Sequence, residues 1–214
     1  MNEAKKSWMS KMRTIGLALC LLTPWTTTVA NAQDDINNVI AALNSKVVKI
    51  RREAVESFGE TASSLSVKDV APVTRKALKD PVAEVRFYGI ILVEAAIWGA
   101  VSQNAVRIDL EILEPVLVAA LQDSDARVRA TAAGIFAYVG TLPTGAEERL
   151  KELAVGDERL AAEPAARTLV EKGRDRAAVQ RIVDKLVTGG PQWRRTLGAR
   201  LLTQGLEDPA AMEE

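Results

Sequence analysis

The sequence contains no histidine and a single cysteine, Cys20, so it has little of two side chains that many enzymes use. Histidine is the usual general base near neutral pH, and histidine and cysteine are the usual zinc ligands. These absences exclude a Ser-His-Asp triad and a zinc site built from histidine and cysteine. We therefore expect a protein that is not an enzyme and that needs no metal or cofactor. An enzyme that uses only carboxylates, lysines or hydroxyls is the less favoured alternative.

An excess of charge of one sign is also missing. The chain has 28 Lys and Arg residues against 28 Asp and Glu residues, and aromatic residues make up only 4% of it. A nucleic-acid-binding protein usually carries a basic face, which this mixture of charges does not predict. The abundance of alanine and leucine favours helices over strands. We therefore predict an all-helical protein without a nucleic-acid partner.

One apolar run stands near the N-terminus, at residues 15–22, and it is too short to span a membrane. Eight helical residues cover about 12 Å of a hydrocarbon core that is about 30 Å thick. Positive side chains precede the run, at Lys5, Lys6, Lys11 and Arg13, and the small residues Ala30 and Ala32 follow it. This order is typical of a secretory signal peptide.

We therefore predict a cleavable signal peptide over residues 1–32, with a retained anchor as the alternative. Cleavage would remove the only cysteine, so the mature chain could form no disulfide in an oxidising compartment. The expected route is general secretion, to a periplasmic or secreted location, with no membrane association after cleavage. The oligomeric state is left open.

The rest of the chain is repetitive. Leucines recur at Leu43, Leu78, Leu121, Leu153 and Leu186, and the pattern around two of them is nearly the same. The first copy reads Leu78, Asp80, Val85, Arg86 and Gly89, and the second reads Leu121, Asp123, Val128, Arg129 and Ala132. Weaker copies pair Leu43 with Ile50 and Arg51, Leu153 with Leu160, and Leu186 with Trp193 and Arg194. Internal repeats at such spacings indicate a stacked array of small units.

Each repeat has the apolar spacing of two helices separated by a polar turn. The expected helices cover residues 36–43 and 47–62, 67–78 and 82–100, 112–121 and 128–139, 146–153 and 158–172, and 176–186 and 192–204. Residues 99–107 are expected to be a loop or an extension of the second helix of unit two. The tail over 207–214 is acidic and is expected to fray.

The segment Pro115-x-Leu117-x3-Leu121-x-Asp123-x4-Val128-Arg129-x2-Ala132 resembles a HEAT repeat nearly position for position. The shorter spacings also resemble the bacterial HEAT-like units of phycobilin lyases and of many scaffold proteins. The resemblance implies an α-solenoid over residues 33–206, made of about five antiparallel helix pairs wound into a right-handed superhelix. It places the first helix of each pair outside and the second helix on the concave side.

The resemblance also implies roles for single residues. Asp80 with Arg86, and Asp123 with Arg129, are expected to form a structural ladder between adjacent units, with an anion site lined by the arginines as the alternative. Pro72 and Pro115 are expected to kink their helices. Ala161 stands where the arginine is expected, so the ladder should be interrupted in unit four. Pro164 should delay or kink the second helix of that unit.

Four aromatic residues are candidate partner-binding residues: Phe87, Tyr88, Trp98 and Trp193. Phe87 and Tyr88 are neighbours and cannot both join one core stripe, so one of them should reach the concave surface. Exposed aromatic side chains often anchor interfaces, although packing in the core is the alternative. The sequence as a whole favours an exported scaffold or adaptor that binds a protein or peptide along its concave face. An accessory or regulatory subunit of an exported enzyme or envelope complex is the alternative.

Overall fold

The computed structural model describes residues 26–103, 109–173 and 175–206, and these residues are all-helical. They form ten α-helices and two short 3-10 helices, and no strand occurs among them, which confirms the predicted all-α class. The proposed tail over 207–214 and most of the proposed signal peptide lie outside the described residues. The proposed cleavage site after Ala32 lies inside helix α2, which begins at Thr26.

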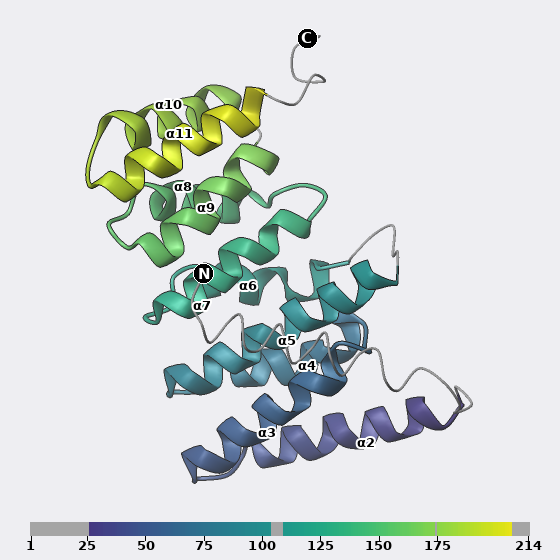
Figure 1. Ribbon diagram of the computed structural model, residues 1–214. Coiled ribbons are helices and arrows are strands. Elements are labelled where there is room, and N and C mark those ends of the chain that lie inside the picture. The colour runs from purple at the N-terminus through teal and green to yellow at the C-terminus, as the bar shows by residue number, and fades with distance from the viewer. Residues whose placement is uncertain (1–25, 104–108, 174, 207–214) are drawn as a thin grey trace. The chain divides into compact units, whose positions relative to one another are not determined.

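Contacts divide the chain into residues 1–34 and residues 35–214, and the second of these units contains the repeats (Figure 1). We number its helix pairs one to five. The pairs are α2 (Thr26–Ala42) and α3 (Val48–Ala62), α4 (Val67–Ala77) and α5 (Ala83–Ser102), α6 (Glu114–Ala120) and α7 (Ala126–Ile135), α8 (Thr144–Ala154) and α9 (Arg159–Lys172), and α10 (Arg176–Thr188) and α11 (Gln192–Leu206). Helix α2 contributes to the second unit only from Asp35 onward. The 3-10 helices η1 (Glu111–Leu113) and η2 (Phe136–Tyr138) precede α6 and follow α7.

Polar residues in the turns begin several of these helices. The Ser66 side chain accepts a hydrogen bond from the Asp69 N–H, and the Asp69 side chain accepts one from the Ser66 N–H, so α4 begins with a capping box. Asp125 and Asp175 cap α7 and α10 in a similar way. Such caps satisfy N–H groups that have no partner within the helix. The repeated polar turns of the sequence therefore become well-defined helix starts.

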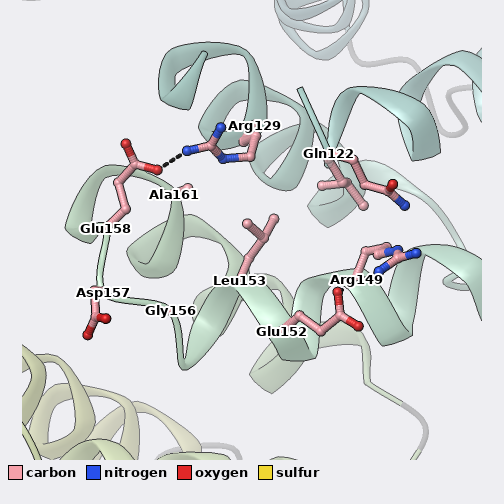
Figure 2. A pocket seen from close by; sticks show the side chains of 10 residues that line it. Gln122, Arg129, Arg149, Glu152, Leu153, Gly156, Asp157, Glu158 and Ala161 are labelled. Carbon is pink, nitrogen blue, oxygen red and sulfur yellow. Dashed lines mark hydrogen bonds and ion pairs between the residues drawn. The ribbon is translucent and has the colours of Figure 1, made fainter. Parts of the chain in front are cut away.

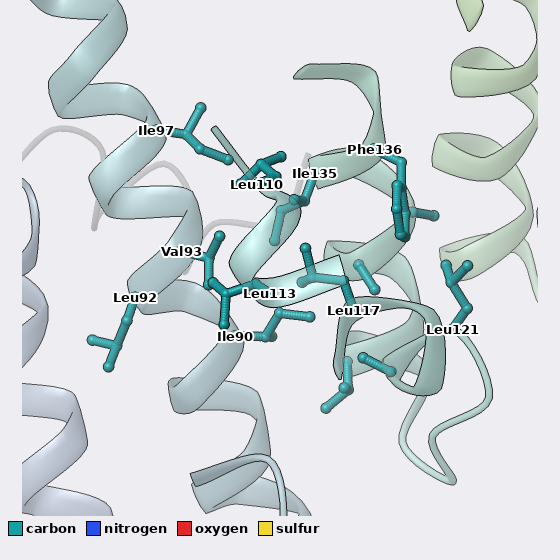
Figure 3. Close-up of a cluster of buried hydrophobic side chains, with 14 of the residues drawn as sticks. Ile90, Leu92, Val93, Ile97, Leu110, Leu113, Leu117, Leu121, Ile135 and Phe136 are labelled. Atoms are coloured by element: carbon teal, nitrogen blue, oxygen red, sulfur yellow. The ribbon is translucent and has the colours of Figure 1, made fainter. Parts of the chain in front are cut away.

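The core consists of apolar side chains shared between successive pairs (Figure 3). Buried leucines lie in α6, at Leu117, and directly after it, at Leu121. Helix α5 contributes the buried Ile90 and Ile97, and η2 contributes the buried Phe136. Each second helix contacts the second helix of the next pair, so α3, α5, α7, α9 and α11 are connected in series. Because burying one such side chain stabilises the fold by about 1.5–3 kcal/mol, the pairs stabilise one another.

Helix α5 is long and apolar enough, by length and composition alone, to cross a membrane, and among the described residues it alone passes that test. Its apolar residues include Val85, Ile90, Leu92 and Val93, which are buried inside the protein. Helix α5 contacts α3, α4 and α7, so neighbours cover it on several sides. Burial against three helices accounts for its composition.

The prolines fall at different points of their helices. Pro72 lies inside α4, whereas Pro115 lies in the first turn of α6, after the 3-10 helix η1. A proline in the first helical turn costs no hydrogen bond because the N–H there has no helical partner. The expected kink within a helix at Pro115 is therefore wrong. Pro164 lies inside α9, which begins five residues earlier at Arg159, so this proline does not delay the helix.

The repeat alignment of pair four also needs correction. Val85 and Val128 are each the third residue of their second helix and are fully buried. In α9 the third residue is Ala161, which is 1% exposed, whereas Leu160 is 53% exposed. The sequence alignment placed Leu160 at the valine position, one residue too early. A small alanine occupies that buried position, and the leucine beside it faces outward.

Candidate functional site

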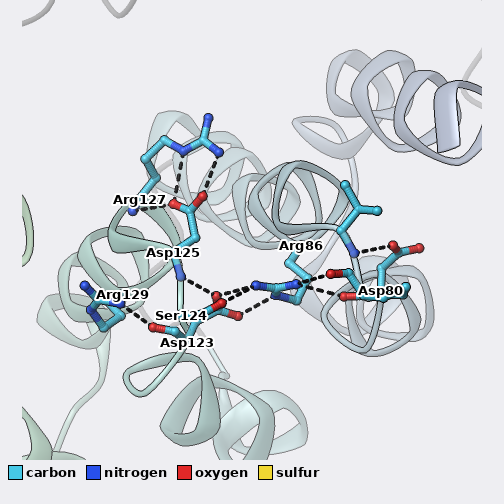
Figure 4. A network of polar contacts seen from close by, with 9 residues as sticks. Asp80, Arg86, Asp123, Ser124, Asp125, Arg127 and Arg129 are labelled. Atoms are coloured by element: carbon cyan, nitrogen blue, oxygen red, sulfur yellow. Dashed lines mark hydrogen bonds and ion pairs between the residues drawn. The ribbon is translucent and has the colours of Figure 1, made fainter.

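Arginines at the start of the second helices connect neighbouring pairs (Figure 4). The Arg86 guanidinium donates from Nε to Asp123 Oδ2 at 2.7 Å and from Nη2 to Asp123 Oδ1 at 2.8 Å. Arg51 makes the same two-pronged contact with Asp80, at 2.6 and 3.0 Å. A planar guanidinium fits a carboxylate in this way, and the geometry fixes both partners. We call these contacts the polar ladder.

Each ladder arginine also donates to the turn of its own pair. Arg51 Nη1 donates to the Ser45 carbonyl at 3.0 Å, and Arg86 Nη1 donates to the Asp80 carbonyl at 3.0 Å. Arg129 donates to the Asp123 carbonyl in the same way. Within pair two, Arg86 thus bonds to the backbone carbonyl of Asp80 and not to its carboxylate. The Asp80 carboxylate pairs with an arginine of pair one, and the Arg86 guanidinium pairs with an aspartate of pair three. Sequence spacing grouped Asp80 with Arg86 and Asp123 with Arg129, whereas the side chains pair Arg51 with Asp80 and Arg86 with Asp123.

The turns explain this offset. One carboxylate oxygen of Asp123 accepts the Asp125 N–H at 2.8 Å, and Asp80 accepts the Val82 N–H at 2.9 Å. These hydrogen bonds hold each aspartate side chain against the backbone of its own turn. In that position the arginine of the preceding pair can bond to the carboxylate. Ser45 in pair one lacks a carboxylate, and it contributes its backbone carbonyl to Arg51 instead.

The ladder changes the acidity of its aspartates. Burial raises the pKa of the Asp80 carboxyl, but hydrogen bonds from Arg51 and from the Val82 N–H, with the charges of Arg51 and Arg86, outweigh it. The pKa of Asp80 therefore lies below its usual value. For Asp123, burial again raises the pKa, and the hydrogen bonds from Arg86 and from the Asp125 N–H, with the Arg86 charge, bring it below the usual value.

Pair four breaks the pattern. The fourth residue of the second helix is Arg51, Arg86 and Arg129 in the first three pairs but Ala162 in α9. Arg129 bonds to Glu158, and no arginine of α9 continues the ladder. Arg194, the third residue of α11, instead reaches back to the turn of pair four. It donates to the Val155 carbonyl at 3.0 Å and to Asp157 Oδ1 at 2.7 Å.

A hollow of about 360 Å³ lies beside this break, between pairs three and four (Figure 2). Arg129 and Arg149 line it together with Glu152, Asp157 and Glu158. The charges compensate one another, because Arg129 bonds to Glu158 and Arg149 Nη1 donates to Glu152 at 2.7 Å. This arrangement offers neither a catalytic pair nor an unbalanced arginine for an anion.

The candidate aromatic residues are engaged to different degrees. Phe87 and Tyr88 are both half-buried, with ring centroids 5.7 Å apart. The Arg127 guanidinium lies 4.8 Å from the Phe87 ring centroid, and the Tyr88 hydroxyl donates to Glu56 Oε1 at 3.0 Å. Phe87 therefore contacts pair three and Tyr88 contacts pair one, so neither side chain stands free on the surface.

Trp193 and Trp98 also differ from each other. Trp193 is half-buried, and the Arg194 guanidinium lies 5.3 Å from its ring centroid. Trp98 is 52% exposed. Its ring centroid lies 6.3 Å from that of Tyr138, in an edge-on arrangement with an angle of 67° between the rings. Of the four candidate aromatics, Trp98 presents the most surface to a partner.

Sequence reasoning did not select Tyr138. It lies in the short helix η2 after α7, forty residues after Trp98, and no repeat position relates the two. Burial raises the pKa of the Tyr138 hydroxyl, and the negative charges of Glu94 and Glu171 raise it further. Of these residues, only Glu94 could have been placed near Trp98 from the sequence, because it lies one helical turn earlier and shares the same helix face.

Comparison with known proteins gives little beyond the fold. No protein-family model matches the chain, and no curated protein matches it. The crystal structure of an engineered protein, from the Northeast Structural Genomics Consortium, is similar with a TM-score of 0.54 and 22% sequence identity. The similarity covers 80% of this chain and 79% of that chain. At this identity it indicates a shared helical fold and nothing about activity.

Proposed function

We propose that the chain is an exported, non-catalytic scaffold that binds a protein or peptide along the surface of its second helices. In this proposal the helix pairs form a HEAT-like α-solenoid, a right-handed superhelix with the second helices on its concave side. The series of contacts from α3 through α5, α7 and α9 to α11 supports it. The first helices of successive pairs contact one another less, as expected for helices on the outer side of a curve.

The observation that carries the proposal is the regular surface formed by the second helices. Side chains there, including Arg52, Phe87, Arg127 and Arg200, contact residues of the neighbouring pairs. Stacked units present such a surface as one extended platform, which suits an extended partner. An accessory subunit of an exported enzyme or envelope complex would use the same surface, and the identity of the captured partner would distinguish it from a free adaptor.

A photo-crosslinking experiment with the full chain in its host tests the proposal. A photoreactive amino acid at the exposed Arg167 of α9 should capture a partner, and the same amino acid at the exposed Glu148 of α8 should not. Both sites belong to pair four, so the comparison separates the second-helix surface from the first-helix surface. Equal capture at both positions, or capture at Glu148 alone, would contradict the proposal.

A further inference from the structure

The strongest unexplained feature of this surface is the pair of rings formed by Trp98 and Tyr138. Trp98 is exposed, whereas its neighbours Ala95, Ala96 and Ile97 on α5 are buried. The backbone beneath it is fixed, because a Cβ added at the next residue, Gly99, would lie 1.8 Å from the carbonyl oxygen of Ser63. Only glycine permits that approach, so α5 passes close to the end of α3 directly beside Trp98.

Carboxylates act on the Tyr138 hydroxyl. Besides burial, the negative charges of Glu94 and Glu171 raise the pKa of this hydroxyl. The other aromatic residues of this surface are different. Arginines lie over Phe87 and Trp193, and Arg52 acts on Tyr88 against the carboxylates beside it. Among the residues that the structure describes, no such cation lies over Trp98 or Tyr138.

The geometry points to a binding site for the cationic side chain of a partner polypeptide, formed by Trp98, Tyr138 and Glu171. An ammonium or guanidinium group is attracted to the face of an aromatic ring, most strongly to tryptophan, and to a nearby carboxylate. This inference rests on the proposed function, since it assigns the chemistry of one contact on the second-helix surface.

The surroundings of the two rings suit both the apolar stem and the charged head of a lysine or arginine side chain. Val101 lies three residues after Trp98 on α5 and is 41% exposed, so it offers an apolar surface beside the ring. Long basic side chains place their methylene stems along such surfaces while the charged head meets polar groups. The site therefore favours a basic residue of an extended peptide over an acidic or a purely apolar one.

The probe for the test is an N-acetylated hexapeptide amide of alternating alanine and lysine. The control is the same peptide with every lysine acetylated on Nζ, which removes the charge and keeps the stem. Affinity is measured on the full chain by fluorescence anisotropy of the labelled peptides. The position of binding is measured from the indole N–H resonance of Trp98, which the Trp98→Leu variant identifies among the four tryptophans.

The lysine peptide should shift the Trp98 resonance saturably and bind at least about fivefold more tightly than the acetylated peptide, as a ring–cation contact of this kind supports. Trp98→Leu should remove that preference for the lysine peptide, and Glu171→Gln should reduce it about threefold.

The matched control is Trp193→Leu. It should leave the preference unchanged, because in the parent protein Arg194 already lies over the Trp193 ring. Equal affinity for both peptides, or an unchanged preference in Trp98→Leu, would overturn the inference. The two proposals can fail separately. If the photoreactive residue at position 167 captures a partner but the lysine and acetylated peptides bind equally, only the cation site is refuted. If capture occurs at position 148 alone while the lysine peptide still binds more tightly, only the scaffold surface is refuted.

Discussion

At the scale of single residues, the ladder arginines differ in the surroundings of their carboxylate partners. Arg86 and Asp123 are nearly covered, with side-chain exposures of 12% and 10%, whereas Glu158, the partner of Arg129, is 49% exposed. Solvent screens an exposed ion pair, and removing one member of a buried pair leaves an uncompensated charge. Arginines at equivalent repeat positions should therefore contribute unequally to stability.

Arg86→Gln should lower the free energy of unfolding by about 3 kcal/mol, because Asp123 would remain buried without its partner. Arg129→Gln should cost about 1 kcal/mol, because Glu158 can turn to water. Urea denaturation followed by circular dichroism measures both variants against the parent. Equal losses for the two variants would show that burial of the partner does not set the strength of the contact.

The ladder should also make the protein sensitive to acid. The folded-state pKa values of Asp80 and Asp123 lie below their usual values. Their contribution to stability is therefore complete above the unfolded-state pKa of about 4 and is lost as the pH falls through the lower folded-state values. The substitution Asp123→Asn keeps the shape and removes the titration. Its unfolding free energy should be lower than that of the parent at pH 6 and should fall less steeply below pH 4; parallel curves would disprove this.

At the scale of elements, close contact between α4 and α5 depends on Gly89. The repeat has alanine at this position in pair three, and a Cβ at Gly89 would lie 2.5 Å from the Ala77 Cβ. Gly89→Ala should destabilise the protein by about 1–3 kcal/mol because the two helices must separate. Gly134→Ala in α7 is the control, since its Cβ meets no atom within 4 Å, and it should stabilise the protein by about 0.5 kcal/mol. Thermal unfolding of both variants tests the pair, and stabilisation by Gly89→Ala would contradict the close contact.

Helices were the most predictable part of the protein. Apolar spacing and polar turns placed all five pairs, because each helix needs one apolar face and a start signal, and both are local. The alignment of pair four failed by one residue, because Leu160 is apolar and no local rule distinguishes an exposed leucine from a buried one. Tyr138 could not be assigned, because its contact with Trp98 depends on how α5 and η2 pack.

At the scale of the whole molecule, the ion pair that joins the last two helix pairs is more exposed than the one that joins the first two. Arg51 and Asp80 are covered by protein, whereas Asp157, the partner of Arg194, is fully exposed. In an array of stacked units, stability is roughly the sum of the units and the contacts between neighbours. Helix α11 also contacts α9 less than any other second helix contacts its neighbour, so pair five has the weakest attachment.

Hydrogen exchange should reveal the weaker attachment of pair five. Amides of α10 and α11 should exchange faster than those of α4 and α5, because opening a terminal part breaks fewer and weaker contacts. Mass spectrometry of peptides under native conditions measures the difference. Uniform protection from α3 to α11 would mean that the pairs open only together, and the weaker ladder at pair four would then have no consequence for stability.

The offset of the ladder also decides which segment of the chain can be exchanged. Each contact of the polar ladder joins the arginine of one pair to the aspartate of the next. The segment that can be removed or repeated therefore begins at one ladder aspartate and ends just before the next ladder aspartate, as from Asp80 to Gln122. Removing that unit would bring Arg51 opposite Asp123, and the same two-pronged contact would form again. A shortened chain of this kind should still unfold in one cooperative transition. Gene duplication or deletion in steps of this unit would change the length of the protein and preserve the arginine–aspartate contact between the pairs that become neighbours.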